Sequence, residues 1–213
     1  AGRRMVVAGY GWCGRGIAMR ARGMGARVTV TEVDPVRATE ALLDGMDVAP
    51  IGEAVKDADF LVTVTGCSSV VTPEHFRAAK DGIVVANAGH FDVELDLEGL
   101  GGISTEVRSV RDDVTRYVLD DGSRVDVLAD GRLVNLAAGQ GHPVEIMDMS
   151  FALQALSVAH IVRNRGKLTP GVHPVPKELD QEVAWAALAS MGIEIDCLTD
   201  AQCDYMDSWK EGT

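Results

Sequence analysis

The feature that most constrains this chain is a set of glycines directly after a short apolar segment near its N-terminus. The stretch "VVAGYGWCGRG" spaces Gly9, Gly11 and Gly14 as G-x-G-x-x-G. The apolar residues 5–8 indicate a buried parallel strand, and residues 15–24 have helical composition, so the glycines are expected at a strand-to-helix turn. In such a turn the first glycine makes the bend, the second lets a pyrophosphate approach the backbone, and the third lets the helix pack on the strand. The helix N-terminus then offers free N–H groups to the phosphates.

An acidic residue strengthens this interpretation, because glycines also gather at ordinary turns. A second strand is predicted at residues 27–31, and Glu32 follows it directly. This is the position, about twenty residues past the glycines, where a carboxylate binds the ribose hydroxyls of an adenosine. Such an acid repels a 2′-phosphate and favours NAD over NADP, whereas the nearby Arg37 weakens the preference because an arginine can accept that phosphate. The alternative is that Glu32 is only a solvated residue at a strand end.

Composition and charge narrow the class of protein. The chain has 213 residues, 46% of them hydrophobic, and a formal net charge of −12. It can bury a full core, but it lacks the basic surface that nucleic acid or an anionic membrane requires. We see no apolar run of membrane-spanning length and no signal-peptide pattern, so we expect a cytoplasmic protein.

The cysteines predict no metal site. They form no C-x-x-C pair and have no histidine at zinc-finger spacing, so reduced thiols are expected. The four are Cys13, Cys67, Cys197 and Cys203.

Strands and helices alternate along the first half of the chain. A strand is predicted at residues 60–65, then a helix with Thr72 as N-cap and Pro73 at its first position, then a buried strand in "DGIVVANAGH". This β-α-β-α order predicts the α/β class, with a doubly wound parallel sheet of the Rossmann type.

The pattern changes after Gly101. Short strands alternate with Asp-Gly turns at residues 121–122 and 130–131, which favour hairpins that close the sheet edge. A long helix over residues 144–164 follows, then a linker rich in proline and glycine, and two short amphipathic helices. We therefore divide the chain into a cofactor domain (1–142), a connecting helix (143–164) and a C-terminal extension of linker and helices (165–213), which we expect to pack on a substrate domain or another subunit.

Five stretches together resemble one family. "GYGWCGRG", "TEVDP", "VTVTGCSSVVTPEHF", "NAGHFDVELD" and "GRLVNLAAGQGHPVEIMDMSFALQA" are similar, in order and spacing, to the cofactor domain and C-terminal segment of the S-adenosylhomocysteine hydrolase family. The resemblance covers nearly the whole chain, and "GHFD" with "RLVNL" and "GHP" is far more specific than the glycine loop. It implies a permanently bound NAD that oxidises the 3′-hydroxyl of the substrate ribose. Homocysteine is then eliminated, water adds, and the ketone is reduced back.

The resemblance also implies site residues. His90 would lie beside the nicotinamide and the substrate ribose, where an imidazole can position water or move protons, and His142 would act with Phe91 as a gate at the substrate entrance. Both histidines are assigned as catalytic, although without the resemblance each would be interpreted as a loop histidine. No metal is implied. The implied cofactor contacts are Gly9, Gly11, Trp12, Cys13, Gly14, Arg15, Gly16, Glu32, Val33, Asp34, Arg37, Thr65, Gly66, Cys67, Ala88, Gly89, His90 and Asn135.

Two parts of the family pattern are missing from this sequence. The substrate domain that precedes the glycine loop is absent, so we expect a fragment, a processed product or one half of a split enzyme that is inactive alone. The basic, aromatic tail of many members is not reproduced by Trp209 and Lys210, which suits a subgroup with a short tail. The substrate would be S-adenosylhomocysteine or S-inosylhomocysteine, bound through the missing domain, and a homo-oligomer is expected.

Two other classes of protein are considered. A D-2-hydroxyacid dehydrogenase would carry an arginine in an N-x-x-R-G context, and "VNLAAGQGHP" has none. A stand-alone NAD-binding or sensing module without catalysis would also fit a chain that lacks the catalytic half.

Overall fold

The computed structural model describes residues 1–207 and divides into two compact units, Ala1–Gly141 and a second that begins at His142. Each unit is described by itself. The tail residues Trp209 and Lys210 lie outside the described residues.

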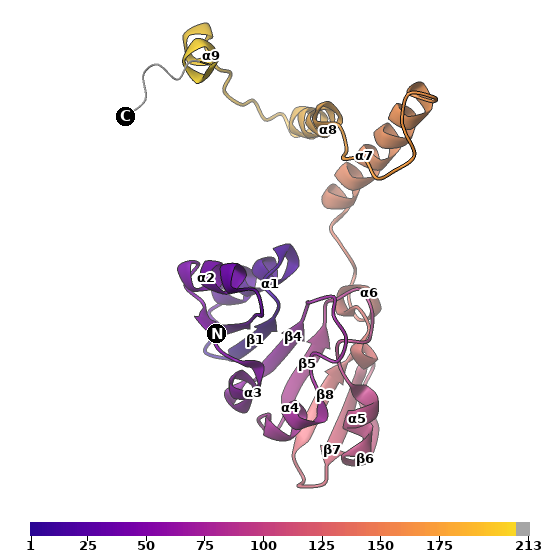
Figure 1. The fold of residues 1–213 in the computed structure, drawn as a ribbon. Coiled ribbons are helices and arrows are strands. Elements are labelled where there is room, and N and C mark those ends of the chain that lie inside the picture. Colours follow the sequence, from indigo (N-terminus) through magenta and orange to yellow (C-terminus); the bar gives the residue numbers. More distant parts are fainter. Residues whose placement is uncertain (208–213) are drawn as a thin grey trace. The chain divides into compact units, whose positions relative to one another are not determined.

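The first unit is built on one sheet with the strand order β3-β2-β1-β4-β5-β8-β7-β6 (Figure 1). The first six strands in this order pair in parallel, and the last two are antiparallel. The α/β fold with a mostly parallel, Rossmann-like sheet is thus confirmed. In chain order the strands are β1 (Arg4–Ala8), β2 (Arg27–Thr31), β3 (Asp47–Val48), β4 (Phe60–Thr63), β5 (Ile83–Asn87), β6 (Ser104–Arg111), β7 (Val114–Leu119) and β8 (Arg124–Leu128).

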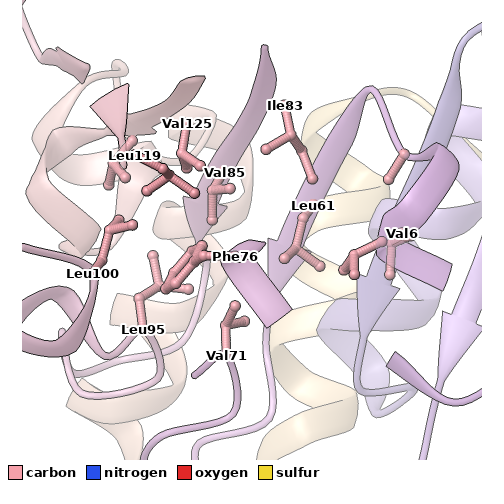
Figure 2. Packing of buried hydrophobic residues seen from close by; sticks show 13 residues of the cluster. Val6, Leu61, Val71, Phe76, Ile83, Val85, Leu95, Leu100, Leu119 and Val125 are labelled. Carbon is pink, nitrogen blue, oxygen red and sulfur yellow. The ribbon is translucent and has the colours of Figure 1, made fainter. Parts of the chain in front are cut away.

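Helices cover both faces of this sheet. Because successive side chains of a strand point to opposite faces, Val6 joins a core cluster with Phe76 of α4 and Leu100 of α5 (Figure 2), whereas Val7 joins a second cluster with Ala18 of α1. Both faces are therefore dry, which explains the nearly continuous apolar runs of the parallel strands. The helices of this unit are α1 (Trp12–Gly23), α2 (Pro35–Leu43), α3 (Ile51–Ala54), α4 (Pro73–Ala78), α5 (Leu97–Gly102) and α6 (Val134–Ala137), with 3₁₀ turns at η1 (Val55–Asp57) and η2 (Ala129–Gly131).

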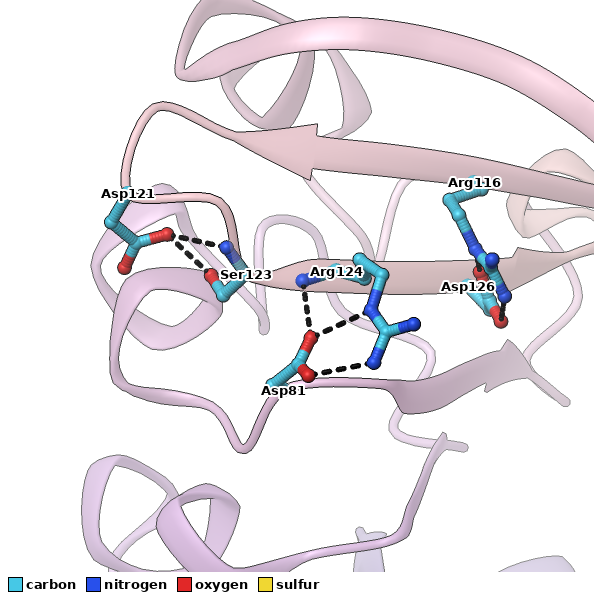
Figure 3. A network of polar contacts seen from close by, with 6 residues as sticks. All are labelled: Asp81, Arg116, Asp121, Ser123, Arg124 and Asp126. Carbon is cyan, nitrogen blue, oxygen red and sulfur yellow. Dashed lines mark hydrogen bonds and ion pairs between the residues drawn. The ribbon is translucent and has the colours of Figure 1, made fainter.

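Ion pairs fix the antiparallel edge of the sheet (Figure 3). Asp81, just before β5, accepts hydrogen bonds from the backbone N–H and the guanidinium of Arg124 at 2.7–2.9 Å. Arg116 of β7 and Asp126 of β8 are directly opposite in register and form a bidentate pair at 2.7 and 2.8 Å. The two pairs align β8 with β5 on one side and with β7 on the other.

One of the two predicted Asp-Gly hairpins forms. The turn at residues 121–122 joins β7 to β8, with Gly122 at φ +85° and the Asp121 carboxylate accepting hydrogen bonds from Ser123. The second prediction, at residues 130–131, is wrong, because these residues lie in the turn η2 after β8 and no strand follows them among the described residues. The chain continues into α6 instead.

Two predicted element boundaries also differ from those in the structure. Helix α1 begins at Trp12, not at residue 15, so Gly14 lies inside its first turn. Strand β4 ends at Thr63, not at residue 65, because its pairing with β1 and β5 stops there, although the alternating sequence continues.

The second unit consists of three helices in its described residues: α7 (Val144–Arg163), α8 (Lys177–Ser190) and α9 (Asp200–Asp207). In α8, the first of the two predicted amphipathic helices, Val183 is buried, whereas Met191 is exposed and lies past the helix end. Helix α7 is long and apolar enough, by length and composition alone, to cross a membrane, which the sequence did not lead us to expect. It contacts α8, and none of its residues is buried.

A matched pair of glycines in α1 tests the packing of this helix on β1. A Cβ at Gly14 would lie 2.0 Å from the carbonyl oxygen of Gly9, whereas a Cβ at Gly16 meets no atom within 4 Å. We expect Gly14→Ala to lower the free energy of unfolding by about 1–3 kcal/mol through overpacking. Gly16→Ala should raise it by roughly 0.5–1 kcal/mol, because alanine is the better helix former. Urea unfolding of both variants measures this, and equal effects would contradict the close approach.

Candidate functional site

The predicted site residues of the first unit gather at one edge of the sheet. Strands β1, β4 and β5 are parallel neighbours, so their carboxyl ends and following loops share an edge. Backbone hydrogen bonds continue past the strand ends, from Val64 N to Ala8 O at 2.9 Å and from Ala88 N to Thr63 O at 2.7 Å. In an open parallel sheet this edge is where ligands bind.

The three glycines of the first loop have different reasons to be glycine. Gly9 has φ +103°, and a Cβ there would lie 3.0 Å from Val64 O. Gly14 must let α1 approach β1. Gly11 has an ordinary φ of −70°, and a Cβ there would meet only a guanidinium nitrogen of Arg37, at 3.6 Å. The fold therefore needs Gly9 and Gly14 for itself but leaves open space over Gly11, as a loop that admits a pyrophosphate should.

The N-terminus of α1 faces this space without a protein cap. Gly11 is its extended N-cap residue, no side chain among the described residues accepts a hydrogen bond from the first turn, and that turn holds no acidic residue. The helix thus retains free N–H donors and the positive end of its dipole for an anion. These features of the loop and helix fit a dinucleotide.

Glu32 joins the glycine loop to the turn after β2. Its carboxylate accepts hydrogen bonds from the backbone N–H of Tyr10 at 2.7 Å, Val33 at 2.7 Å and Asp34 at 3.1 Å. Burial alone would raise the pKa of Glu32, but these donors, aided by the charge of Arg37, lower it below its ordinary value. A carboxylate has about four lone-pair sites, so three donors leave room for a ribose hydroxyl.

A polar network under the glycine loop was not predicted. Tyr10 is only 2% exposed, and its hydroxyl donates to Asp44 at 2.8 Å. Arg15, predicted as a cofactor contact, forms an ion pair with the same carboxylate at 2.9 Å. Burial, then the hydrogen bond to Asp44, raises the pKa of Tyr10 to about 12. The loop is therefore supported from below by a neutral phenol and an ion pair.

The loop after β4 is held by a residue that the sequence pattern did not single out. Glu94 is buried, and it accepts hydrogen bonds from Thr65 N at 3.0 Å, Thr65 Oγ1 at 2.8 Å and Gly66 N at 2.8 Å. Thr65 and Gly66 are themselves exposed at the sheet edge.

The loop after β5 carries His90 and is organised by the buried side chain of Asn87. Asn87 Oδ1 accepts from Gly89 N at 2.7 Å, and Nδ2 donates to Phe91 O at 2.8 Å and to Gly131 O at 2.8 Å. These bonds hold the residues on either side of His90. The His90 ring is exposed and contacts the Phe91 ring edge-on, with centroids 4.5 Å apart.

The remaining predicted residues lie at the rim or apart. Trp12 and Val33 are 92% and 98% exposed, so their apolar side chains are available to a ligand. Asn135 lies in α6, which follows the carboxyl end of β8. His142 belongs to the second unit, so its proposed partnership with Phe91 stays a prediction. Rim residues whose roles also stay predictions are Cys13, Gly16, Asp34, Arg37, Cys67 and Ala88.

A hollow elsewhere on the first unit is not a candidate site. It lies at the amino ends of the strands, and its charged side chains pair with one another: Asp59 with Lys80 at 2.7 Å and with Arg3 at 3.1 Å, and Asp57 with Arg4. The hydrogen bond from Lys80 is the main reason that the pKa of Asp59 falls to about 2. These carboxylates and the cations beside them are therefore paired with one another.

Comparison with known proteins identifies the first unit as an NAD-binding domain. The family described as "S-adenosyl-L-homocysteine hydrolase, NAD binding domain" matches residues 1–141. Over its whole length, the chain is 55% identical to an adenosylhomocysteinase from Gloeobacter violaceus and covers 50% of that protein. It is 58% identical to an adenosylhomocysteinase from Saccharolobus solfataricus and covers 51% of it. The chain thus spans about half the length of the curated relatives it matches. The solved structure of a phosphoglycerate oxidoreductase from Vibrio cholerae is similar over 48% of this chain and 34% of its own, at 21% identity and a TM-score of 0.44; this likeness carries no functional argument.

Gly11 gives a test of ligand binding that is separate from folding. Gly11→Val should abolish NAD binding, because the side chain would fill the open space above the loop. The free energy of unfolding should fall by no more than about 1 kcal/mol, the size of an N-cap preference. Calorimetric titration and urea unfolding measure the two effects. Normal NAD affinity in this variant would mean that the loop is only structural.

Tyr10 gives a test by pH. The phenol of Tyr10 has a higher pKa in the folded state, about 12, than in the unfolded state, about 10. Its contribution to the free energy of unfolding is therefore fully present below about pH 10 and is lost as the pH rises toward about 12. We expect Tyr10→Phe to lack this loss, so between about pH 9 and about pH 11 the wild type should lose about 1 kcal/mol more than the variant. Urea unfolding at both pH values checks it, and parallel losses would remove Tyr10 as the cause.

Proposed function

This chain belongs to the S-adenosyl-L-homocysteine hydrolase family and corresponds to its NAD-binding half, and from that membership we propose that it forms the cofactor-binding half of an enzyme that hydrolyses S-adenosylhomocysteine. The observation that carries the proposal is the loop over Gly11, whose open space faces the uncapped N-terminus of α1. Family membership also excludes the alternative that the chain is the NAD domain of a D-2-hydroxyacid dehydrogenase.

When bound, NAD would accept a hydride from the 3′-carbon of the substrate ribose and return it at the end of the reaction. The residues of this chain bind and orient it. The first turn of α1 donates N–H groups to the pyrophosphate, and Glu32 accepts a hydrogen bond from a ribose hydroxyl of the adenosine. Its negative charge disfavours a 2′-phosphate, so the site should prefer NAD over NADP.

The loops after β4 and β5 form the nicotinamide end of the site in this proposal. Thr65 and Gly66 follow one strand, and Ala88 to His90 follow its neighbour. His90 is exposed at the apex of its loop, where its imidazole can position a water or move a proton at the substrate ribose. Phe91, 65% exposed, and His142 would close the substrate entrance.

The substrate-binding half of the site must come from outside this sequence. We propose that it is supplied by the part of the relatives that this chain does not match, and that the exposed apolar residues of α7 and α8 pack on it or on a second copy within a homo-oligomer. S-adenosylhomocysteine and S-inosylhomocysteine are both candidate substrates. A cytoplasmic setting is expected. The second candidate function, a stand-alone NAD-binding or sensing module, needs only the first unit.

Titration of the purified chain with NAD and separately with NADP tests the cofactor part of the proposal. After removal of any nucleotide that co-purifies, we expect clear NAD binding, much weaker NADP binding, and no hydrolysis of S-adenosylhomocysteine. Glu32→Ala should weaken NAD binding by about 1–3 kcal/mol, because the charge-assisted hydrogen bond to the ribose hydroxyl is lost.

Three results would contradict these expectations. Unchanged NAD affinity in Glu32→Ala would remove Glu32 from the site. Equal affinity for NAD and NADP would remove its proposed selectivity. Turnover of S-adenosylhomocysteine by this chain alone would refute both the division of labour with a second half and the sensor alternative.

A further inference from the structure

Glu94 is an ionisable side chain that the proposed function does not use. It is 1% exposed, and all its described hydrogen-bond donors belong to the loop after β4: two N–H groups and one hydroxyl. No arginine, lysine or histidine among residues 1–207 forms an ion pair with it. Burial of a carboxylate is costly unless hydrogen bonds compensate it, so the loop and the acid depend on each other.

The donor geometry requires a carboxylate. Oε2 accepts from Thr65 N and Thr65 Oγ1, and Oε1 accepts from Gly66 N. A glutamine offers only one acceptor oxygen, and its NH₂ group would face an N–H donor on one side. An apolar side chain would leave all three donors unpaired. An unpaired donor costs more free energy when it is buried than when water can replace the lost partner.

The same carboxylate touches the loop that carries His90. A Cβ at Gly89 would lie 1.8 Å from Glu94 Oε1, so the two groups are packed as closely as a glycine permits. Backbone bonds from Ser69 N to Val93 O at 2.8 Å and from Val71 N to Glu94 O at 3.1 Å fix the segment that carries Glu94. Glu94 therefore lies between the loop of Thr65 and the loop of His90 and contacts both.

We propose that Glu94 is a positioning residue that sets the nicotinamide end of the cofactor site. It holds Thr65 and Gly66 by hydrogen bonds, and its contact with Gly89 holds the start of the His90 loop. The inference rests on the proposed function, because it assumes that these two loops receive the nicotinamide. Among the described residues, its side chain forms hydrogen bonds with Thr65 and Gly66 and none with the glycine loop or Glu32, so its effect should be largest at one end of the dinucleotide.

Two ligands separate the ends of the site. ADP-ribose has the adenosine and the pyrophosphate but lacks the nicotinamide. We expect Glu94→Gln to weaken NAD binding by about tenfold while ADP-ribose affinity stays within about twofold of the wild type. Glu32→Gln should weaken both ligands alike. Glu98→Gln, which removes the same charge from an exposed position on α5, is the matched control and should change neither.

The outcomes are distinct. Equal losses for NAD and ADP-ribose in Glu94→Gln, or unchanged NAD affinity, would overturn the inference and leave Glu94 a structural residue. If that variant does not fold, Glu94→Asp retains the charge but shortens the side chain; selective loss of NAD supports the proposal, and wild-type affinity for both ligands overturns it. If the wild-type chain binds neither ligand, its own loops do not form a complete cofactor site; the sensor alternative falls, and this inference is overturned because it assigns the nicotinamide to those loops.

Discussion

The contact between α1 and β1 at Gly14 is the constraint on which the site depends. Only a hydrogen atom fits between the Cα of Gly14 and the carbonyl of Gly9. Because this contact lets the helix start almost on top of the strand end, its N-terminal N–H groups lie at the carboxyl edge of the sheet. A helix displaced by one methyl group would present its dipole elsewhere. The open space over Gly11 has meaning only because Gly9 and Gly14 have already fixed the loop around it.

Carboxylates that accept backbone N–H groups organise the rest of this edge. Glu32 binds the glycine loop to the turn after β2, and Glu94 binds the loop after β4 to the segment after β5. Each gathers donors from loops that are distant in sequence, which a parallel sheet brings together at strand ends. A ligand at this edge therefore meets loops that are already in place, and little conformational entropy remains to be lost on binding.

Local signals in the sequence located several features correctly, although the Asp-Gly signal at residues 130–131 and the alternation past Thr63 did not. The glycine spacing, the bounds of β2 and the turn at Asp121 follow from backbone conformations or from the pattern of apolar residues within a few positions. Asn87 and Glu94 could not be found this way, because "NAGHFDVELD" has the composition of a polar loop and the partners of Glu94 lie 28 and 29 residues away. The start of α1 was misplaced because Gly14 and Gly16 lower its helical propensity, while packing against β1 decides it.

The antiparallel strand β6 is an edge strand of the sheet, so one of its sides has no neighbouring strand in the first unit. Such an edge is a template on which a second chain can add a strand. Here the strand carries three charged residues, Glu106, Arg108 and Arg111, and its register shifts near both ends. Irregular pairing and charge make a poor template for another strand. The hairpin beyond the parallel strands thus ends the sheet in a charged and irregular strand, which disfavours pairing with the edge of another chain.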